Sequence, residues 1–455
     1  MFIAAALLGA TSPAPAARDV SLLDIVELDM GYTTITDNYY QAASPQRLLD
    51  GARTGIVAYL RGRGVADPAV PLLRARPDGR GVVPAIEQQL GKAIDRYGSR
   101  VETRELVYAA ICGELAALHD PYSVFFRRAE LRRFTTALDG APFGGIGVSL
   151  ALTAEGEYQA DQVFDDAPAA RAGLLAGDRI VAVDGKPLAG RSPAAVAALL
   201  KGRAGTTVQL DVLRAADAQT QRLSIVRAAI TPPEVSARLL PGDVAYIALR
   251  GFGPAAGEQV RAALIRLRAR GARATLFDLR GNGGGYETAA VRVASVFVPS
   301  GTIVVTQTNH GHQNIVVADG TAPAPQPLAV LVDRDSASGS ELVTGAIADH
   351  GLGKVVGTRT FGKGLVQTMF PLPDGSAVKL TTARYFTPGG HDIDGIGLRP
   401  DLAVDEPATA LRGVPGSDPQ LDAALALLAQ VHANSVPCSR CVSHVSIKRR
   451  AIVSK

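Results

Sequence analysis

The chain has few cysteines, few lysines and no long hydrophobic run. Three cysteines in 455 residues, an odd number, argue against a disulfide framework. The net charge of +4 is small for this length and gives no reason to expect nucleic acid as a partner. No apolar run approaches the roughly 20 residues that cross a bilayer, so we expect no transmembrane span.

Three motifs that would suggest a metal or a nucleotide are incomplete. The CxxC at Cys438–Cys441 lacks a second CxxC or a spaced histidine pair, and it lies in a polar segment, 431–455, that we expect to be a disordered tail. His310 and His312 have no third ligand nearby in the sequence. Arg280–Gly285 follows neither GxxxxGK[ST] nor GxGxxG. We therefore expect neither a metal nor another cofactor.

The first residues have part of the pattern of an export signal. Phe2–Ala10 is apolar and Ala14-Pro15-Ala16 fits a small-x-small cleavage site, but no basic residue precedes the apolar run. We expect residues 1–18 to be a signal or processing segment, which predicts an exported protein of the periplasm or cell envelope. A misassigned start is the alternative.

The rest of the chain divides into three parts. Residues 19–138 have apolar residues at helical spacing and predict a helical region, interrupted by a loop at 63–80 that contains glycines and prolines. Residues 139–230 contain short strand-like runs and one helical run, which predicts a small β-rich domain. Pro232-Pro233 marks the start of the third part, 231–430.

In the third part strands alternate with helices, which indicates an α/β core with a mixed, partly parallel sheet. Sites in such sheets lie where strands end and helices begin. The expected strands are Val244–Leu249, Ala274–Leu279 and Leu328–Val332, and the expected helices are Gly257–Arg270, a segment ending at Val296, and Ser340–Asp349.

A run of small residues, Asp335–Glu341, stands at one of these junctions. Ser338 at its centre has two interpretations. With Glu341 three residues later, it matches a capping box that starts the following helix. The same position would project the hydroxyl from a turn, where the first amides and the dipole of the helix stabilise the oxyanion that a serine nucleophile creates.

Lys363 follows Ser338 by 25 residues, in a chain whose basic residues are mostly arginine. Lysine can lose its proton when burial lowers its pKa from about 10.4, and an amine base activates a serine without any histidine. The flanking Phe361, Leu365 and Val366 would supply an apolar pocket. The alternative is a surface lysine on a glycine turn.

Three further features would complete such a site. Gln367 lies four residues after the lysine and could accept a hydrogen bond from its amine. The glycines at 283–285 predict a bend that brings backbone amides close to a ligand carbonyl. Gly145-Ile146-Gly147-Val148 fits either a bulge or a nest of amides that captures the terminal carboxylate of a peptide.

Seven motifs between Asp120 and Asp401 resemble, in the same order, those of the carboxyl-terminal processing proteases, which are serine peptidases with a PDZ domain and a Ser/Lys pair. Each motif alone is weak, but their shared order is specific. They are Asp120-Pro121-Tyr122-Ser123, Gly144–Val148, the run Ala167–Leu174 with Gly177–Ile180 and Val183–Gly185, Asp278–Asn282, Ser336–Glu341, Thr360–Gly364 with Gln367, and Gly395–Asp401.

The resemblance implies a role for each candidate residue. Ser338 is the nucleophile, Lys363 the general base and Gln367 its orienting partner, and the amides of Gly339 and Gly284 form the oxyanion hole. It also implies that the PDZ domain recognises the C-terminus of the substrate and gates the proteolytic site. The residues implied for this recognition are Gly145, Ile146, Gly147 and Val148.

Two residues depart from the pattern of the family. Gly339 stands where alanine is usual and loosens the backbone next to the nucleophile. Gly283 stands where proline is usual and makes the glycine loop less rigid.

The expected partners are peptide and protein C-termini with apolar ends, and assembly into a homo-oligomer stays open. Two other functions are weighed against proteolysis. The chain could be a PDZ-bearing binding or scaffold protein with an inactive hydrolase core, although the intact Ser338, Lys363 and Gln367 speak against it. An acyl-transfer enzyme acting on thioesters would have no use for a module that reads peptide ends.

Overall fold

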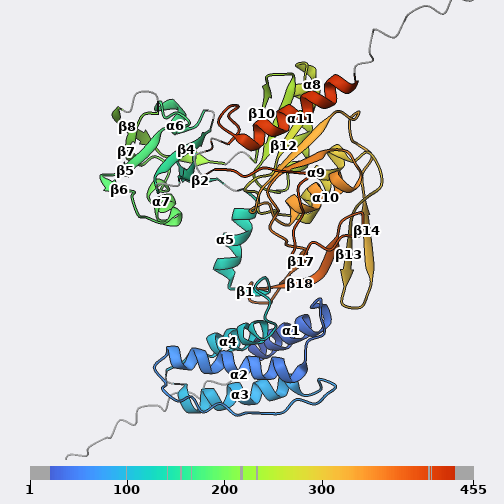
Figure 1. Ribbon diagram of the computed structural model, residues 1–455. Helices are drawn as coiled ribbons and strands as arrows, with labels where there is room; N and C mark the ends of the chain where they lie inside the picture. The colour runs from blue at the N-terminus through green and yellow to red at the C-terminus, as the bar shows by residue number, and fades with distance from the viewer. Residues whose placement is uncertain are drawn as a thin grey trace, which may run out of the picture. The chain divides into compact units, whose positions relative to one another are not determined.

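The computed structural model describes residues 21–435 except positions 99, 141, 154–155, 165, 216–218, 232–233, 408–409 and 411. The chain forms two compact units (Figure 1). One contains the residues up to Thr136 together with 306–314 and 365–385, and the other contains 137–305, 315–364 and the residues from Phe386 onward. The expected leader, 1–18, and the CxxC at Cys438–Cys441 lie outside the described residues.

The first unit is mainly helical, as the apolar spacing predicted. Its four long helices pack side by side around one apolar core (Figure 1). The first helix begins at a capping box, in which the Ser21 hydroxyl accepts from the Asp24 amide at 3.2 Å and the Asp24 carboxylate accepts from the Ser21 amide at 3.1 Å. The helices are α1 (Leu22–Asn38), α2 (Pro45–Gly62), α3 (Val82–Tyr97) and α4 (Thr103–Ala116).

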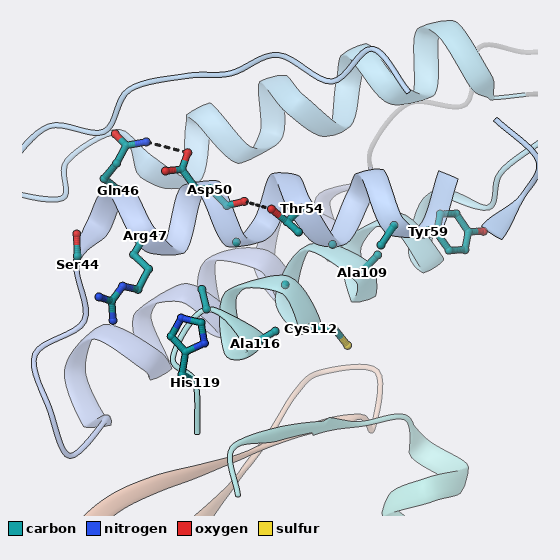
Figure 2. A pocket seen from close by; sticks show the side chains of 15 residues that line it. Ser44, Gln46, Arg47, Asp50, Thr54, Tyr59, Ala109, Cys112, Ala116 and His119 are labelled. Carbon is teal, nitrogen blue, oxygen red and sulfur yellow. Dashed lines mark hydrogen bonds between the residues drawn. The ribbon is translucent and has the colours of Figure 1, made fainter. Parts of the chain in front are cut away.

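Helices α2 and α4 approach until their backbones touch. A Cβ atom on Gly55 would lie 1.9 Å from the carbonyl oxygen of Ala109, and one on Gly113 would lie 2.1 Å from that of Gly51. A hollow of about 870 Å³ runs along the two helices and is lined largely by small residues, with Asp50 bonded to a neighbouring side chain at its edge (Figure 2). None of the predicted catalytic residues lines this hollow.

A β-hairpin distant in sequence completes the first unit. Strand β18 (Ala377–Phe386) pairs antiparallel with β17 (Leu365–Pro371) and with β1 (Val124–Phe126), and the sheet continues to β13 (Thr302–Thr308) and β14 (Gln313–Val317). Apolar residues of the hairpin join the core of the helices, and the hydroxyl of Tyr108 on α4 donates to the carboxylate of Asp374 at the hairpin tip. Helix α5 (Arg128–Leu138) leads out of this unit.

Residues 143–230 form a small β-rich domain with its own apolar core, which contains Ile146, Leu174, Val196 and Ile225. Its main sheet is antiparallel, in the order β3-β4-β5-β7-β8, so that β3 lies at an edge. The elements are β2 (Phe143–Gly145), β3 (Val148–Leu152), β4 (Tyr158–Val163), α6 (Pro168–Arg171), β5 (Arg179–Val183), β6 (Lys186–Pro187), α7 (Pro193–Leu200), β7 (Thr207–Leu213), β8 (Thr220–Val226) and β9 (Ala228–Ile230).

The α/β core is built on a six-stranded sheet, which confirms the predicted fold class. The first two strands are antiparallel, and the remaining pairs are parallel. Three central strands are buried along their whole length, as expected where a parallel sheet is covered on both faces. The strand order is β10 (Val235–Leu240), β11 (Val244–Leu249), β12 (Ala274–Asp278), β15 (Leu328–Val332), β16 (Lys354–Gly357) and β19 (Leu402–Ala403).

Four helices accompany this sheet. Helices α8 (Ala256–Ala269), α9 (Glu287–Phe297) and α10 (Gly339–Asp349) pack against one another, while α11 (Pro419–Ser435) buries its apolar side against the sheet. Helix α11 was not expected from the sequence, and it extends past position 430, where the core was expected to end. No helix within the described residues is long and apolar enough to span a bilayer.

Candidate active site

Ser338 lies between β15 and α10, at the edge of the sheet where the parallel strands end. Its backbone has φ 55° and ψ −110°. Residues other than glycine rarely adopt this conformation, which costs on the order of 1–3 kcal/mol. The serine is half-buried, and the residues on both sides of it are buried. A strained turn that begins a helix holds the serine at the place where the dipole of α10 favours negative charge.

Glu341 joins the loop of Ser338 to the loop of Lys363. Its fully buried Oε2 accepts a hydrogen bond from the backbone N–H of Ser338 and another from that of Lys363, both at 2.9 Å. Its Oε1 accepts from the N–H of Gly362 at 2.7 Å and from the hydroxyl of Thr360 at 2.6 Å. One carboxylate therefore holds the backbones of both candidate catalytic residues.

Lys363 lies on a tight loop between β16 and β17 and is half-buried. Gly362 beside it has φ +89°, and a Cβ atom there would lie 2.9 Å from the amide nitrogens of Ile396 and Gly397. Only glycine fits this position without strain. Phe361 is 55% exposed, so at most part of its ring can cover the amine, and the apolar pocket stays a prediction. That the amine reaches the hydroxyl of the serine stays a prediction.

Asn282 organises the glycine loop beside the candidate nucleophile. Its Nδ2 donates to the carbonyl of Leu249 at 2.9 Å, and its Oδ1 accepts from the N–H of Gly284 at 2.9 Å. Its own carbonyl accepts from the N–H of Ala337 at 3.0 Å and from the hydroxyl of Ser340 at 2.8 Å. The glycine loop and the serine turn are thus fixed to each other through one buried residue, whose side chain orders the loop and whose backbone carbonyl binds the turn.

Gly284 and Gly339 lie next to each other at Ser338. A Cβ atom on Gly284 would lie 2.9 Å from the Cβ of Ser338 and 3.0 Å from the amide nitrogen of Gly339. The N–H of Gly284 already donates to Asn282, so the oxyanion role of these two amides stays a prediction. A Cβ on Gly339 would lie 3.0 Å from the ring of Phe252, so the alanine that the family usually has here would need this ring to shift by a few tenths of an ångström.

Buried ion pairs hold the start of the glycine loop in place. The guanidinium of Arg280, whose side chain is fully buried, pairs with Asp278 at 2.6 Å and with Asp418 at 2.8 Å. Burial raises the pKa of the Asp278 carboxyl, but Arg280 and the Tyr246 hydroxyl outweigh it and hold this pKa below its usual range. The carboxylate therefore stays ionised, and the ion pairs anchor the start of the glycine loop to α11.

Gln367 belongs to the other compact unit. It lies on β17 at an irregularity in the pairing with β18, and its Nε2 donates to the carbonyl of Leu365 at 3.2 Å. Its role beside Lys363 stays a prediction.

In the loop 145–148 of the β-rich domain, two carbonyl groups accept hydrogen bonds from the domain itself, and the N–H groups of the same peptides point in the opposite direction. The carbonyl of Ile146 accepts from the N–H of Ala169 at 2.8 Å, and the carbonyl of Gly147 accepts from Phe164 at 3.0 Å. Since C=O and N–H point in opposite directions in a trans peptide, the N–H groups of Gly147 and Val148 point the other way. Gly147 has φ +80°, which glycine adopts without strain.

The same loop opens onto a groove between the edge strand β3 and helix α7. The groove has a volume of about 280 Å³, and its walls are mainly apolar. Among the residues along it are Leu150, Pro193, Val196 and Leu200. An edge strand beside an apolar groove is the arrangement that accepts an extended peptide as an additional strand.

Sequence reasoning missed the roles of Glu341 and Asn282. From the sequence, Glu341 has a role only in the capping box. Its contact with Lys363 lies 22 residues away along the chain, and no periodic pattern connects the two positions. For Asn282, the one available signal was a polar residue inside a glycine run that directly follows a buried strand.

Comparison with known proteins identifies the family. The model of peptidase family S41 matches residues 243–404, and a PDZ domain model matches residues 161–214. The chain is 35% identical over 341 residues to the carboxyl-terminal-processing protease of Synechocystis, covering 73% of this chain and 80% of that protein. It is 38% identical to the chloroplastic C-terminal processing peptidase of Tetradesmus obliquus, over 69% of this chain and 72% of the relative.

A solved structure, the photosystem II D1 C-terminal processing protease, matches with a TM-score of 0.50 and 28% identity, over 85% of this chain and 94% of that one. The chain therefore belongs to peptidase family S41, among the carboxyl-terminal processing proteases, and is a serine-type peptidase with a PDZ domain. The resemblance seen in the ordered motifs is confirmed, and the inactive-scaffold and thioester alternatives lose their support.

Proposed function

We propose that this peptidase works through a Ser/Lys dyad formed by Ser338 and Lys363. The observation that carries the proposal is the carboxylate of Glu341, which binds the backbone N–H of both residues. A nucleophile and its base must keep a fixed separation, and one buried acceptor shared between their loops supplies that constraint. The strained backbone of Ser338 at the start of α10 is a second support.

In this mechanism the neutral amine of Lys363 takes the proton of the Ser338 hydroxyl while the serine oxygen attacks the scissile carbonyl. The negative charge on the carbonyl oxygen is stabilised by backbone amides at Gly339 and the glycine loop and by the dipole of α10. The lysine ammonium then protonates the leaving amine, and the acyl-enzyme forms. Water, deprotonated by the same lysine, releases the acyl group and restores the hydroxyl. Gln367 orients the amine.

The substrates of the reaction are proteins with apolar C-terminal residues. We propose that the end of the substrate adds to β3, that its side chains enter the apolar groove beside α7, and that its carboxylate meets the amides at 145–148, including those of Gly147 and Val148. Occupation of the PDZ groove gates the proteolytic site. The enzyme is exported and acts in the periplasm or the cell envelope, a proposal supported by the apolar run near the N-terminus.

Replacing the proposed base tests the dyad. We expect Lys363→Ala to abolish cleavage of a model protein with an apolar C-terminus while the circular dichroism spectrum and unfolding temperature stay close to those of the wild type. Lys354→Ala, which removes an exposed lysine from β16 of the same unit, is the control and should cleave normally. Normal turnover by a folded Lys363→Ala protein would refute the assignment of the base.

A serine-directed acylating probe tests the nucleophile. We expect intact-mass analysis to find one adduct on the wild type and none on Ser338→Ala, and peptide mapping to locate it at position 338. An adduct at another serine, or equal labelling of both proteins, would contradict the proposal.

A further inference from the structure

Among the described residues, the groove of the PDZ domain contains one charged side chain. Thirteen of these residues line it, and Lys201 alone among them carries a formal charge. An apolar groove that binds an internal peptide segment has no need of a cation. A groove that binds a chain end must also compensate the negative charge of the terminal carboxylate, because desolvating an ion without a partner is costly.

Lys201 is located at the end of the groove that carries the outward-facing amides. Its ammonium lies 4.6 Å from the centre of the Phe143 ring, and Phe143 stands two residues before the loop 145–148. The next residue, Gly202, donates its backbone N–H to the carbonyl of Gly144 at 3.0 Å. The end of α7 and the start of the loop are therefore bonded to each other, which fixes the backbone of Lys201 beside the start of the loop.

Capping α7 does not require this lysine. Basic side chains near the end of a helix often bind its last carbonyl groups, and Lys201 directly follows α7. In this domain Arg227 has that role, since its Nε donates to the carbonyl of Leu200 at 2.9 Å and its Nη2 to that of Leu199 at 2.8 Å. The exposed ammonium of Lys201 rests instead against the face of Phe143, at the mouth of the groove.

We propose that Lys201 is the cation that binds the terminal carboxylate of the substrate, together with the amides of Gly147 and Val148. The inference rests on the proposed binding of substrate C-termini in this groove and adds the residue that distinguishes a free chain end from an internal segment. Phe143 holds the ammonium over its ring, so that the charge is positioned before the peptide arrives.

The test measures peptide binding to the full chain carrying Ser338→Ala, which prevents cleavage. The probes are a fluorescent peptide of about ten residues ending in leucine with a free carboxylate, and the same peptide with a C-terminal amide. We expect Lys201→Met to weaken binding of the acid about five- to tenfold and to leave the amide unchanged. Lys201→Arg should stay within about twofold, since it keeps the charge. Added salt should weaken acid binding only where the cation is present.

Lys186→Met is the matched control, because it removes an exposed lysine from β6 of the same domain that does not line the groove. It should bind both peptides as the parent does. Equal weakening of acid and amide by Lys201→Met would mean that the lysine acts only by packing on Phe143, and unchanged preference for the acid would likewise overturn the inference. If the parent protein bound neither peptide, the proposed binding of substrate C-termini in this groove would be wrong. If the parent bound the acid and Lys201→Met bound it equally well, only the role of Lys201 would be wrong.

Discussion

At the scale of single residues, the position of the candidate dyad depends on Glu341. Four donors converge on one buried carboxylate, two from the Ser338 and Lys363 backbones and two from Gly362 and Thr360. A carboxylate has only acceptor oxygens, so it satisfies all four donors, whereas an amide of the same shape turns one acceptor into a donor. The site requires the charge of this side chain as well as its shape.

We therefore expect Glu341→Gln to lower kcat by at least about a hundredfold, because two of the four bonds are lost and an N–H group then faces buried N–H donors. KM for a protein substrate should change little, since the glutamate does not line the PDZ groove. Steady-state kinetics, with an unfolding curve to check the fold, make the measurement.

Glu258→Gln is the matched control. Glu258 is likewise an acidic residue in the first turn of a helix, α8, but it is exposed, so its replacement should leave kcat unaltered. A folded Glu341→Gln enzyme with near-normal kcat would show that the carboxylate does not position the dyad.

The sequence allowed Ser338 and Lys363 to be proposed because each stands in a distinctive local pattern, a small-residue helix start and a lysine between glycines. It did not allow the contacts of Glu341 or Asn282 to be proposed. Those contacts join loops that come together only when β12, β15 and β16 align in one sheet, so nothing in the neighbouring residues reveals them.

At the scale of elements, the sequence predicted strands that have a local apolar pattern but did not predict strands whose position depends on packing between distant segments. The strands Val244–Leu249 and Leu328–Val332 were predicted with the bounds that the structure has, since fully buried strands read as continuous apolar runs. The hairpin of β17 and β18 was not predicted. Its strands belong with helices α1–α4, more than two hundred residues earlier in the chain, and only tertiary packing brings them together.

The contact between α2 and α4 gives a prediction at this scale. Gly55→Ala would insert a methyl group where the carbonyl oxygen of Ala109 lies 1.9 Å away, so the helices must separate. We expect a loss of about 2 kcal/mol or more of unfolding free energy for the helical region. Urea denaturation followed by circular dichroism provides the measurement.

Gly91→Ala is the control for this substitution. Gly91 lies inside α3 with open space where its Cβ would be, so alanine should stabilise that helix by up to about 1 kcal/mol. Opposite signs for the two glycines are expected. Stabilisation by both would mean that α2 and α4 do not touch as described.

At the scale of the whole molecule, the first unit contains carboxylates that the mechanism does not use. Glu27 of α1 is fully buried close to Asp24, Asp374 and Arg104. Burial, followed by the charges of Asp374 and Asp24, raises its pKa to about 7, and Arg104 only partly offsets this. Burial alone raises the pKa of Glu114 on α4 well above its usual range. These acids connect the stability of the helical region, and of the hairpin tip at Asp374, to pH.

The sign of this dependence follows from the direction of the shifts. In the unfolded chain Glu27 loses its proton near pH 4.5, but in the folded protein it keeps the proton up to about pH 7. Between these values the folded state binds more protons, so its stability falls as pH rises. A shift of this size corresponds to about 3 kcal/mol as an upper value. We expect Glu27→Gln, which is neutral at every pH, to be no more stable than the wild type at pH 4 and clearly more stable at pH 8.

Urea unfolding curves recorded by circular dichroism at a series of pH values make this measurement. Glu102→Gln, an exposed glutamate just before α4, serves as control and should follow the wild type throughout. Glu114 contributes a slope of the same sign, which Glu27→Gln retains, because burial also raises the pKa of the Glu114 carboxyl. An equal loss of stability in Glu27→Gln at pH 4 and pH 8 would contradict the prediction. The carboxylate would then be a structural group with bonding partners, and it would give the helical region no pH dependence.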